Sequence, residues 1–451
     1  MTKVKALSAR TFSSLHNRNF RLYMIGQAIS LSGTWMQTVA QAWLVLKLTD
    51  SGTALGLVTA LQFLPVLVLG PWGGVIADRL PKRRVLYATQ AASGVLAVIL
   101  GVLVATGAVE LWMVYVLAGA LGVVAAFDNP TRQVFVLEMV GESELTNAVT
   151  LNSVMVNLAR VVGPALAGAL IAGVGLAVCF LLNGASYIAV LVALAMMRAG
   201  ELHGAQRAPR ARGQLRAGFR YVWSTPALRD TLVMMALVGT LAYEFQVSLP
   251  LLARFTFHGD SGMYATMSSV MGAGAVAGGL WTAGRRAGRL STLGWSSVVF
   301  GAVILAAAVA PGLGAELAAL VAVGAASITF LALGNTMLQL EAAPEMRGRV
   351  MALWSVAFLG STPVGGPIIG VVGEHLGARW SLVVGGVAAV AAGAYGLVGL
   401  RLAARRAAAQ PGPAAPVVVS VTGDGPPDCL VAEASTDAPS DALLAGTGTA
   451  G

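Results

Sequence analysis

Long apolar stretches separated by short polar or charged segments run from about residue 20 to residue 401. A helix needs roughly 20 apolar residues to cross the hydrocarbon core of a bilayer. On that basis the pattern predicts twelve membrane-spanning helices. Their expected ranges are 20–46, 54–77, 85–106, 111–131, 146–172 and 176–197 in the first half, and 230–253, 262–283, 291–310, 315–338, 350–373 and 380–401 in the second.

The segments between these ranges divide the chain into five expected parts. These are an N-terminal cytoplasmic segment 1–19, a first six-helix bundle 20–197, a basic linker 198–229, a second six-helix bundle 230–405 and an acidic tail 406–451. The composition of the tail predicts disorder. Within the linker, 215–223 is expected to form either an amphipathic helix on the anionic inner leaflet or a solvated connection.

The two halves resemble each other at an offset of 202 residues, where Gly163 and Gly168 recur as Gly365 and Gly370. Two similar six-helix halves form a recognised transporter plan. Chance similarity between Gly- and Ala-rich helices is the alternative. The pattern therefore predicts an all-α membrane protein of twelve transmembrane helices in two pseudo-symmetric six-helix bundles.

Composition and charge agree with a membrane protein. The chain is 57% hydrophobic and 11% charged, against about 25% charged in soluble proteins. Of the 29 Lys and Arg residues, only Lys47, Arg254 and Arg379 fall in predicted outer loops, and Arg160 lies within a span. This asymmetry predicts a multi-pass protein of the cytoplasmic membrane with both termini in the cytoplasm. It also explains the net charge of +9 without a nucleic-acid partner.

A charged turn follows the second predicted span and reads Gly74-x-x-Ala77-Asp78-Arg79-x-x-Lys82-Arg83. Together with twelve spans in two halves, it resembles the signature of the major facilitator superfamily, over about residues 15–405. Pro81 departs from the family, which usually has Gly there. The resemblance implies that Asp78 locks the two halves on the cytoplasmic side, with Arg347 and Arg349 as possible partners. The alternative is a turn that only sets topology.

The fifth predicted span contains Arg160-Val-Val-Gly163-Pro164 and, four residues later, Gly168. This resembles the antiporter signature of the superfamily, which occurs mainly in exporters, although alanines replace two of its usual glycines. Pro164 removes one helical hydrogen bond and bends a helix, so a purely structural kink is the alternative. At a finer level, the stretches 17–22, 128–132 and 147–164 look like the siderophore- and macrolide-exporter branch.

Polar stripes follow the first and fifth predicted spans in steps of three and four, which place each stripe on one helix face. Amides and hydroxyls are costly against lipid tails, so both faces are expected to line a water-accessible cavity for a small-molecule substrate. Hydrogen bonding between helices is the alternative. The stripes are Gln27, Ser30, Thr34, Gln37 and Gln41, and Thr146, Thr150, Ser153, Asn157 and Arg160.

Ionisable residues at membrane depth are functional candidates. Arg160 and Glu244 lie near the middle of their spans, with Thr240 one turn from Glu244, and Asp128 and Arg132 lie near the cytoplasmic end of the fourth. Burial disfavours a charged carboxylate, so a Glu244 that alternates between water and a closed cavity could take up and release a proton. A static Glu244–Arg160 pair and a contact with substrate charge are the alternatives.

The resemblance alone does not imply proton coupling. Many proton antiporters of the superfamily carry an Arg ahead of a Gly in span four, where this chain reads Ala-Gly-Ala-Leu-Gly at 118–122.

The expected function is secondary transport by alternating access. A monomer would export a small organic molecule, such as a siderophore, an antibiotic or a drug-like compound, in exchange for protons. Import or facilitation by the same fold, and a non-transporting membrane sensor or scaffold, are the alternatives. The sequence has no Gly-x-x-x-x-Gly-Lys-Ser/Thr loop, no His-Glu-x-x-His and no metal-spaced His cluster. No enzyme activity, cofactor or metal is therefore expected.

Overall fold

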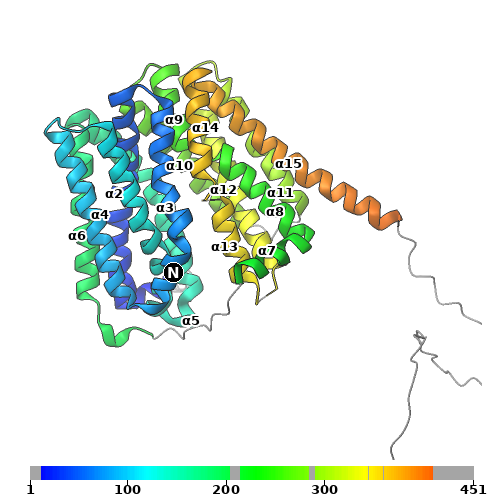
Figure 1. Ribbon diagram of the computed structural model, residues 1–451, viewed down its shortest axis with the longest axis horizontal. Helices are drawn as coiled ribbons and strands as arrows, with labels where there is room; N and C mark the ends of the chain where they lie inside the picture. The colour runs from blue at the N-terminus through cyan, green and yellow to red at the C-terminus, as the bar shows by residue number, and fades with distance from the viewer. Residues whose placement is uncertain (1–11, 204–213, 284–289, 344, 359, 410–451) are drawn as a thin grey trace, which may run out of the picture. The chain divides into compact units, whose positions relative to one another are not determined.

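The computed structural model describes residues 12–203, 214–283, 290–343, 345–358 and 360–409. Contacts divide the chain into a unit Met1–Ala404 and a second unit Arg405–Gly451, and the fold described below is that of the first. The predicted acidic tail lies outside the described residues from 410 onward. Within the described residues the chain is helical and contains no strand (Figure 1).

Helices occupy every range expected to cross a membrane. Nine helices of the described residues are long and apolar enough to do so; the count of twelve stays a prediction. The first half contains η1 (Ser13–His16), α2 (Arg18–Thr49), α3 (Gly52–Arg79), α4 (Lys82–Ala105), α5 (Leu111–Gly173), α6 (Leu176–Met196) and η2 (Ala199–Glu201). The second contains α7 (Gln214–Ser224), α8 (Pro226–Leu237), η3 (Val238–Ala242), α9 (Phe245–Leu251), η4 (Leu252–Thr256), α10 (Ser261–Ala283), α11 (Leu290–Ala308), α12 (Leu313–Glu341), α13 (Arg347–Phe358), α14 (Thr362–His375) and α15 (Ala378–Ala409).

The interval expected to be a loop between spans four and five is helical. α5 runs for 63 residues, and its only non-helical residue is Gly141, with φ 72° and ψ 176°. A positive φ is cheap for glycine and costly for other residues, which explains why the chain turns there. In the segment before the turn, the acid Glu138 pairs with Lys82 at the start of α4, 2.8 Å away.

The seventh expected span is built from four short pieces. α8 passes into the π-helix η3, the chain leaves helical geometry at Tyr243 and Glu244, and α9 and the π-helix η4 follow. Single π-turns within helices occur frequently at functional sites. Pro250 lies within α9 and has no N–H for the helical ladder. This span is therefore the most irregular of the described helices.

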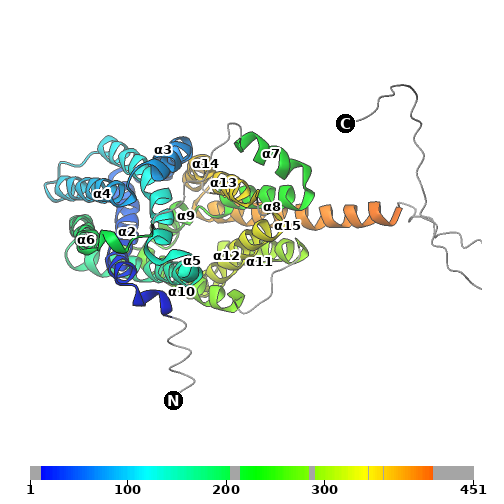
Figure 2. The same ribbon diagram turned by 90° about the horizontal axis from the view of Figure 1, so that it is seen from below.

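The helices of the two halves meet along α3 and α14 and along α5 and α10, as the view from below shows (Figure 2). Glycines allow this approach, since a Cβ at Gly370 would meet the Gly52 carbonyl and one at Gly168 would meet the Ala265 side chain. Small residues at such contacts are typical of membrane helices. Gly168 and Gly370 are equivalent in the sequence repeat, and both pack against the opposite half.

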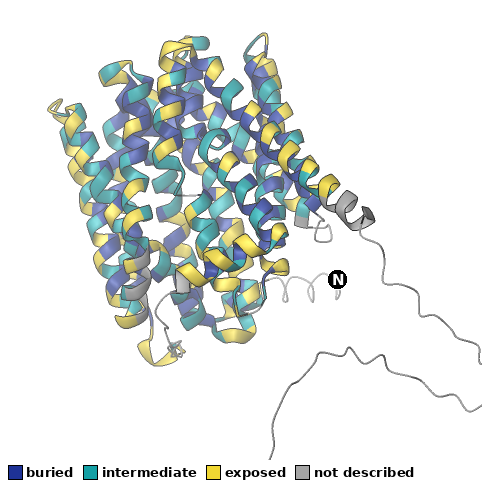
Figure 3. Cartoon of the chain, turned by 45° about the vertical axis from the view of Figure 1, so that its right-hand side comes forward, coloured by how far each residue is buried: buried dark blue, intermediate teal, exposed yellow. Residues whose placement is uncertain are grey.

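The outward faces of the helices are largely apolar. Figure 3 shows exposed positions along the outer helices, and among these are large side chains such as Ile25, Val95, Trp112 and Leu280, each more than half exposed. A contiguous apolar exterior of this kind fits a bilayer rather than water.

The basic linker contains a helix, α7, over the range expected to be helical, and its placement on the inner leaflet stays a prediction. Gly218 and Val222 are buried against the second half, where Gly218 approaches Arg349 of α13. Phe219 and Trp223 point outward, are about half exposed, and stack with ring centres 4.9 Å apart. The Tyr221 hydroxyl accepts a hydrogen bond from the Ala343 backbone N–H (3.1 Å). The linker is thus attached to the second half through α7.

Candidate functional site

A polar cavity lies within the first half and reaches α9 of the second. Its polar lining consists of Thr34, Gln37, Thr38, Gln41, Thr59, Gln62, Asn183, Tyr187 and Gln246. The described residues that line it carry no charge. Three residues of the stripe predicted on span one, Thr34, Gln37 and Gln41, are among them. In this conformation the cavity has a volume of about 30 Å³, which is room for about one water molecule, and Ala42, Leu55, Val58 and Leu121 complete its lining.

The same stripe also makes hydrogen bonds between helices. The Asn183 Nδ2 of α6 donates to the Gln37 Oε1 (2.7 Å), and the hydroxyls of Thr34 and Tyr187 lie 3.4 Å apart. Ser30 is buried and its backbone carbonyl accepts from the Thr34 hydroxyl. Both interpretations of the stripe thus have a basis in the structure, because its members line the cavity and join α2 to α6.

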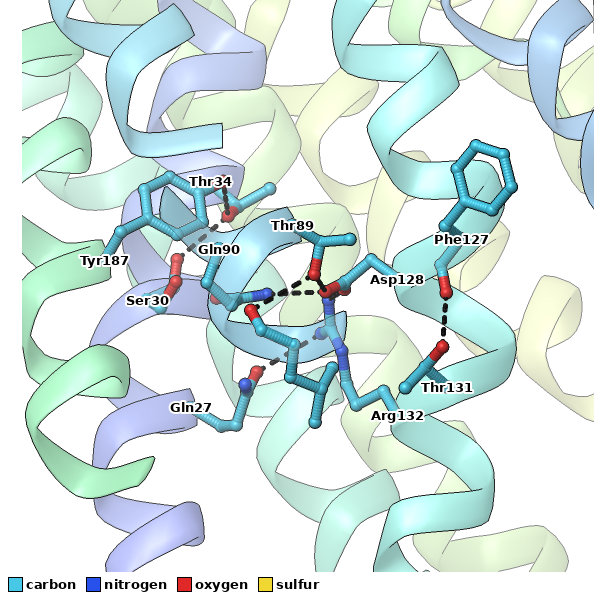
Figure 4. Close-up of polar contacts among 11 residues, drawn as sticks. Gln27, Ser30, Thr34, Thr89, Gln90, Phe127, Asp128, Thr131, Arg132 and Tyr187 are labelled. Atoms are coloured by element: carbon cyan, nitrogen blue, oxygen red, sulfur yellow. Dashed lines mark hydrogen bonds and ion pairs between the residues drawn. The ribbon is translucent and has the colours of Figure 1, made fainter. Parts of the chain in front are cut away.

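Asp128 and Arg132 form a buried ion pair one turn apart in α5 (Figure 4). The Asp128 Oδ1 also accepts hydrogen bonds from Thr89 Oγ1 (2.7 Å) and Gln90 Nε2 (2.8 Å) of α4. The Arg132 Nη1 donates to Gln27 Oε1 of α2 (3.2 Å). Asp128 is 4% exposed, and a buried charge is tolerated only when it is paired and hydrogen-bonded. This network connects α2, α4 and α5.

Arg160 lies beside an aromatic ring rather than an acid. Its guanidinium carbon is 5.1 Å from the centre of the Trp35 ring of α2, within the range of a cation–π contact. No ion pair joins Arg160 to Glu244 among the described residues, so the static pair weighed from the sequence is not present in this structure. Arg160 instead fixes α5 against α2.

The antiporter-like segment packs α5 against two helices. A Cβ at Gly163 would meet the Trp35 side chain and the Ser32 carbonyl of α2, and Gly168 lies against Ala265 of α10. Pro164 is buried, and the backbone stays helical through it. The segment therefore brings α5 close both to a helix of its own half and to a helix of the other half.

Glu244 is buried where span seven loses helical geometry. It is 4% exposed, and the Thr362 side chain of α14 lies beside its carboxyl. Its Oε1 has no hydrogen-bond partner among the described residues. A Cβ at Gly365 would meet both this oxygen and the Thr240 carbonyl. The carboxyl is thus enclosed between spans seven and eleven, two residues before Gln246, which lines the cavity.

Tyr243 and Phe245, the chain neighbours of Glu244, belong to an aromatic cluster. Tyr243 lies 5.0 Å from Phe358 and 5.9 Å from Phe245, measured between ring centres, and Phe245 lies 6.3 Å from Phe300. These ring contacts pack span seven on both sides of Glu244 against Phe300 and Phe358. Thr240 itself donates its hydroxyl to the Ala236 carbonyl (2.7 Å), so its side chain is satisfied within its own helix.

The polar stripe predicted on span five makes its hydrogen bonds within the helix. The Thr150 and Ser153 hydroxyls and the Asn157 amide each donate to the carbonyl four residues earlier, over 2.8, 2.9 and 2.8 Å. Thr150 and Ser153 are exposed, and Asn157 is half-buried. These side chains do not join helices, and they do not line the polar cavity described above.

The charged turn lies at the end of α3 and the start of α4. Gly74, Ala77 and Asp78 are within α3, but their side chains lie outside the described part of the structure. Arg79 is exposed, Lys82 pairs with Glu138, and Arg83 Nη2 donates to the Ala195 carbonyl of α6 (3.1 Å). Lys82 and Arg83 therefore bind within the first half.

The expected partners of Asp78 lie at the start of α13. The Arg347 Nε donates to the Ala342 carbonyl (3.3 Å), and the Arg349 Nη1 lies 3.1 Å from the Met346 sulfur. Both arginines thus contact residues of their own half, and the cytoplasmic lock remains a prediction.

Comparison with known proteins identifies the family. The family described as transmembrane secretion effector, MFS_3, matches residues 9–419. The chain belongs to this family. The resemblance stated from the sequence motifs is therefore confirmed, and the protein is a multi-span membrane transporter rather than an enzyme.

Individual proteins similar to this MFS_3 member include the staphyloferrin A transporter of Staphylococcus aureus, 32% identical over 164 residues. That match covers 36% of this chain and spans 41% of the length of that protein. The multidrug efflux pump Tap of Mycobacterium tuberculosis is 27% identical over 374 residues, covering 78% of this chain and 88% of Tap.

Among solved structures, a bacterial homolog of the human lysosomal transporter Spinster, in an inward-facing and unoccupied conformation, has the same fold. Its TM-score is 0.70 at 16% identity, over 85% of this chain and 96% of that one.

Several residues of the site in this MFS_3 transporter were not predicted. Thr89 and Gln90 are neighbouring polar residues and Asn183 is a further one, all within apolar stretches, and so short a polar signal is weak. Glu138 and Glu316 were also missed. Glu316 is 1% exposed at the start of α12, and its Oε1 has no hydrogen-bond partner among the described residues.

Proposed function

We propose that this transporter exports a small organic molecule across the cytoplasmic membrane in exchange for protons, by alternating access, with both termini in the cytoplasm. The observation that carries the proposal is the Glu244 carboxyl. It is buried, one of its oxygens has no partner among the described residues, and it lies on a broken span next to the wall of a polar cavity.

Proton exchange follows from the cost of burying charge. An ionised carboxylate without a partner is expensive away from water, so enclosure of Glu244 favours proton uptake and exposure to water favours release. A cycle that alternately encloses and exposes Glu244 therefore moves protons with each turnover. The irregular geometry at Tyr243 and Glu244 supplies a place where span seven can change shape.

Export and substrate class have separate support. The Gly163–Pro164–Gly168 segment resembles an exporter signature, and Tap is named as an efflux pump. The uncharged cavity lining suits molecules recognised through hydrogen bonds and apolar contact. Asp128 and Arg132 are already bound to each other, so in this proposal they hold the first half together, and Glu244 carries the proton.

The test uses inside-out vesicles containing the full chain, a panel of siderophores, macrolides and dyes, and an imposed proton gradient. The parent is expected to concentrate at least one compound only with the gradient. Glu244→Gln is expected to abolish this dependence, while Glu341→Gln, at an exposed position of α12, keeps it. Gradient-driven transport that is unchanged in Glu244→Gln would refute the coupling.

Two variants separate the alternatives. Pro164→Ala that retains full export would show that this segment is a structural kink and would remove it as support for export, whereas uptake in place of efflux would favour an importer or facilitator of the same fold. Deletion of residues 407–451 without loss of transport would argue against a sensor or scaffold that acts through its tail.

A further inference from the structure

Two charged contacts join the halves at one end of the molecule. The Asp50 Oδ1 accepts hydrogen bonds from the Arg254 Nη2 (2.9 Å) and Nε (3.1 Å). Asp50 follows α2 in the first half, and Arg254 lies in η4 of the second. Asp50 occupies the left-handed region, with φ 48°, and caps the end of α2. The backbone turn that ends α2 thus presents its side chain to the other half.

The second contact runs in the opposite direction. Glu374, at the end of α14 in the second half, accepts hydrogen bonds at its Oε2 from the Ser51 hydroxyl (2.7 Å) and the Thr53 backbone N–H (2.8 Å). Ser51 is the N-cap of α3 and Thr53 is in its first turn. The first N–H groups of a helix are free and carry partial positive charge, so they bind a carboxylate favourably.

The backbones of α3 and α14 touch directly below these contacts. A Cβ at Gly370 would meet the Gly52 carbonyl, and one at Gly56 would meet the Gly366 carbonyl one turn further along. The charged groups therefore lie over a zone where the halves approach without side chains between them. When the halves separate at this end, both charged contacts must break.

We propose that Asp50–Arg254 and Glu374 with the N-terminus of α3 form a latch that closes the outer mouth of the transport pathway. The latch rests on the proposed alternating access and topology, which place Asp50 on the outer side. It completes a pattern on α3, because the resemblance assigns Asp78 at the other end of this helix to the cytoplasmic lock. The latch would then hold the outer end of α3 to span eleven when the outer mouth is closed. Asp78 would hold the cytoplasmic end of α3 to span eleven when the cytoplasmic side is closed.

The exposure of these groups suits a contact that opens in every cycle. The side chains of Arg254 and Asp50 are 42% and 58% exposed, and Glu374 is also exposed. Exposed ion pairs contribute little in water, so their rupture does not trap the closed state. They bias the equilibrium between states rather than hold it fixed.

The test measures access to the pathway from outside. Thr59 of α3 is 5% exposed, lines the polar cavity and packs below Gly366. Thr59→Cys, in a chain with Cys179→Ala and Cys429→Ser, is labelled in right-side-out vesicles with a membrane-impermeant maleimide. Labelling rate reports the population open at this end. The Glu374→Gln variant is expected to label about two- to fivefold faster, the shift expected when an exposed charged contact is lost.

Asp260→Asn is the matched control, since Asp260 is an exposed acid at the same end that accepts from Met263 N–H within its own half (3.1 Å). It is expected to leave the rate unchanged. Asp50→Arg and Arg254→Asp should each label faster, and the double exchange should restore the parent rate. If Glu374→Gln does not fold, Ser51→Ala removes one donor and keeps the carboxylate.

Equal rates in the parent, Glu374→Gln and Ser51→Ala would overturn the latch. Failure of the double exchange would overturn the Asp50–Arg254 part. The labelling assay needs no substrate and no proton gradient. Its result therefore tests the latch separately from the proposed proton-coupled export. Faster labelling only in inside-out vesicles would place these residues at a cytoplasmic mouth and refute the outer assignment.

Discussion

The guanidinium of Arg160 lies over the ring of Trp35, 5.1 Å from its centre. This contact links the antiporter-like segment of α5 to α2 at the depth where Gly163 also touches α2. An arginine over an indole ring stabilises a fold by about 0.5–2 kcal/mol, and the upper value applies where water is excluded from the contact.

This contact predicts coupling between the two side chains. Arg160→Met and Trp35→Leu should each lower the thermal unfolding midpoint in detergent. The double variant should lose about 1 kcal/mol less than the sum of the single losses, and Trp35→Phe should retain part of the coupling. Strictly additive losses would mean that the two side chains do not interact.

The Asp128–Arg132 network predicts a large effect from removing one charge. Asp128→Asn leaves the Arg132 guanidinium, whose side chain is 25% exposed, without its counter-charge, which costs about 3 kcal/mol, the lower end of the cost for a fully buried pair. Asp128→Asn combined with Arg132→Met should recover part of this loss, because no charge is then buried. Unfolding in detergent measures the stability loss of Asp128→Asn and its partial recovery in the double variant. A double variant less stable than Asp128→Asn alone would contradict the structural role assigned to this pair.

The glycine beside Glu244 predicts a steric effect. Gly365→Ala places a Cβ against the Thr240 carbonyl and the Glu244 carboxyl, and overpacking of this kind costs about 1–3 kcal/mol. Transport should fall as well, because the added methyl group would displace the Glu244 carboxyl, which carries the proton in the proposed cycle. Gly70→Ala, at a helical position of α3 with open space around it, is the control for the same substitution. Equal behaviour of the two variants would show that the close approach is unimportant.

Asp78→Asn is expected to slow transport while the protein still folds and inserts. Asp78 is the acid of the charged turn, and the neighbouring bases Lys82 and Arg83 already bind within the first half. Transport assays in vesicles with matched protein levels measure the effect, and Arg79→Gln tests the exposed base beside it. Parent-like rates in Asp78→Asn would refute the cytoplasmic lock and leave the topology untouched.

The positions of the helices were predictable because apolar length alone determines which segments can enter a bilayer. The turn in α5 was not, since it depends on one glycine with positive φ. The helix before this turn contains polar residues, such as Glu138, that resemble a loop until their partner is known. Only the folded chain shows that Lys82 satisfies that acid.

The candidate site was predicted in pieces. Gln27, Asp128 and Arg132 were each identified from the sequence, but their assembly with Thr89 and Gln90 depends on how α2, α4 and α5 pack. The contact of Glu374 with α3 could not be predicted from the sequence for a similar reason. It joins residues more than 300 positions apart, and Glu374 differs from other loop acids only through the helix end that it faces.

The attachment of the linker at both of its ends limits how far the halves can move. The His203 backbone N–H donates to the Glu138 carbonyl of α5 (2.8 Å), and α7 is fixed to the second half from Gly218 onward. The chain between His203 and Gln214 can span at most roughly 40 Å when fully extended. This maximum reach between His203 and Gln214 sets an upper bound on the width of any opening at that end of the transporter.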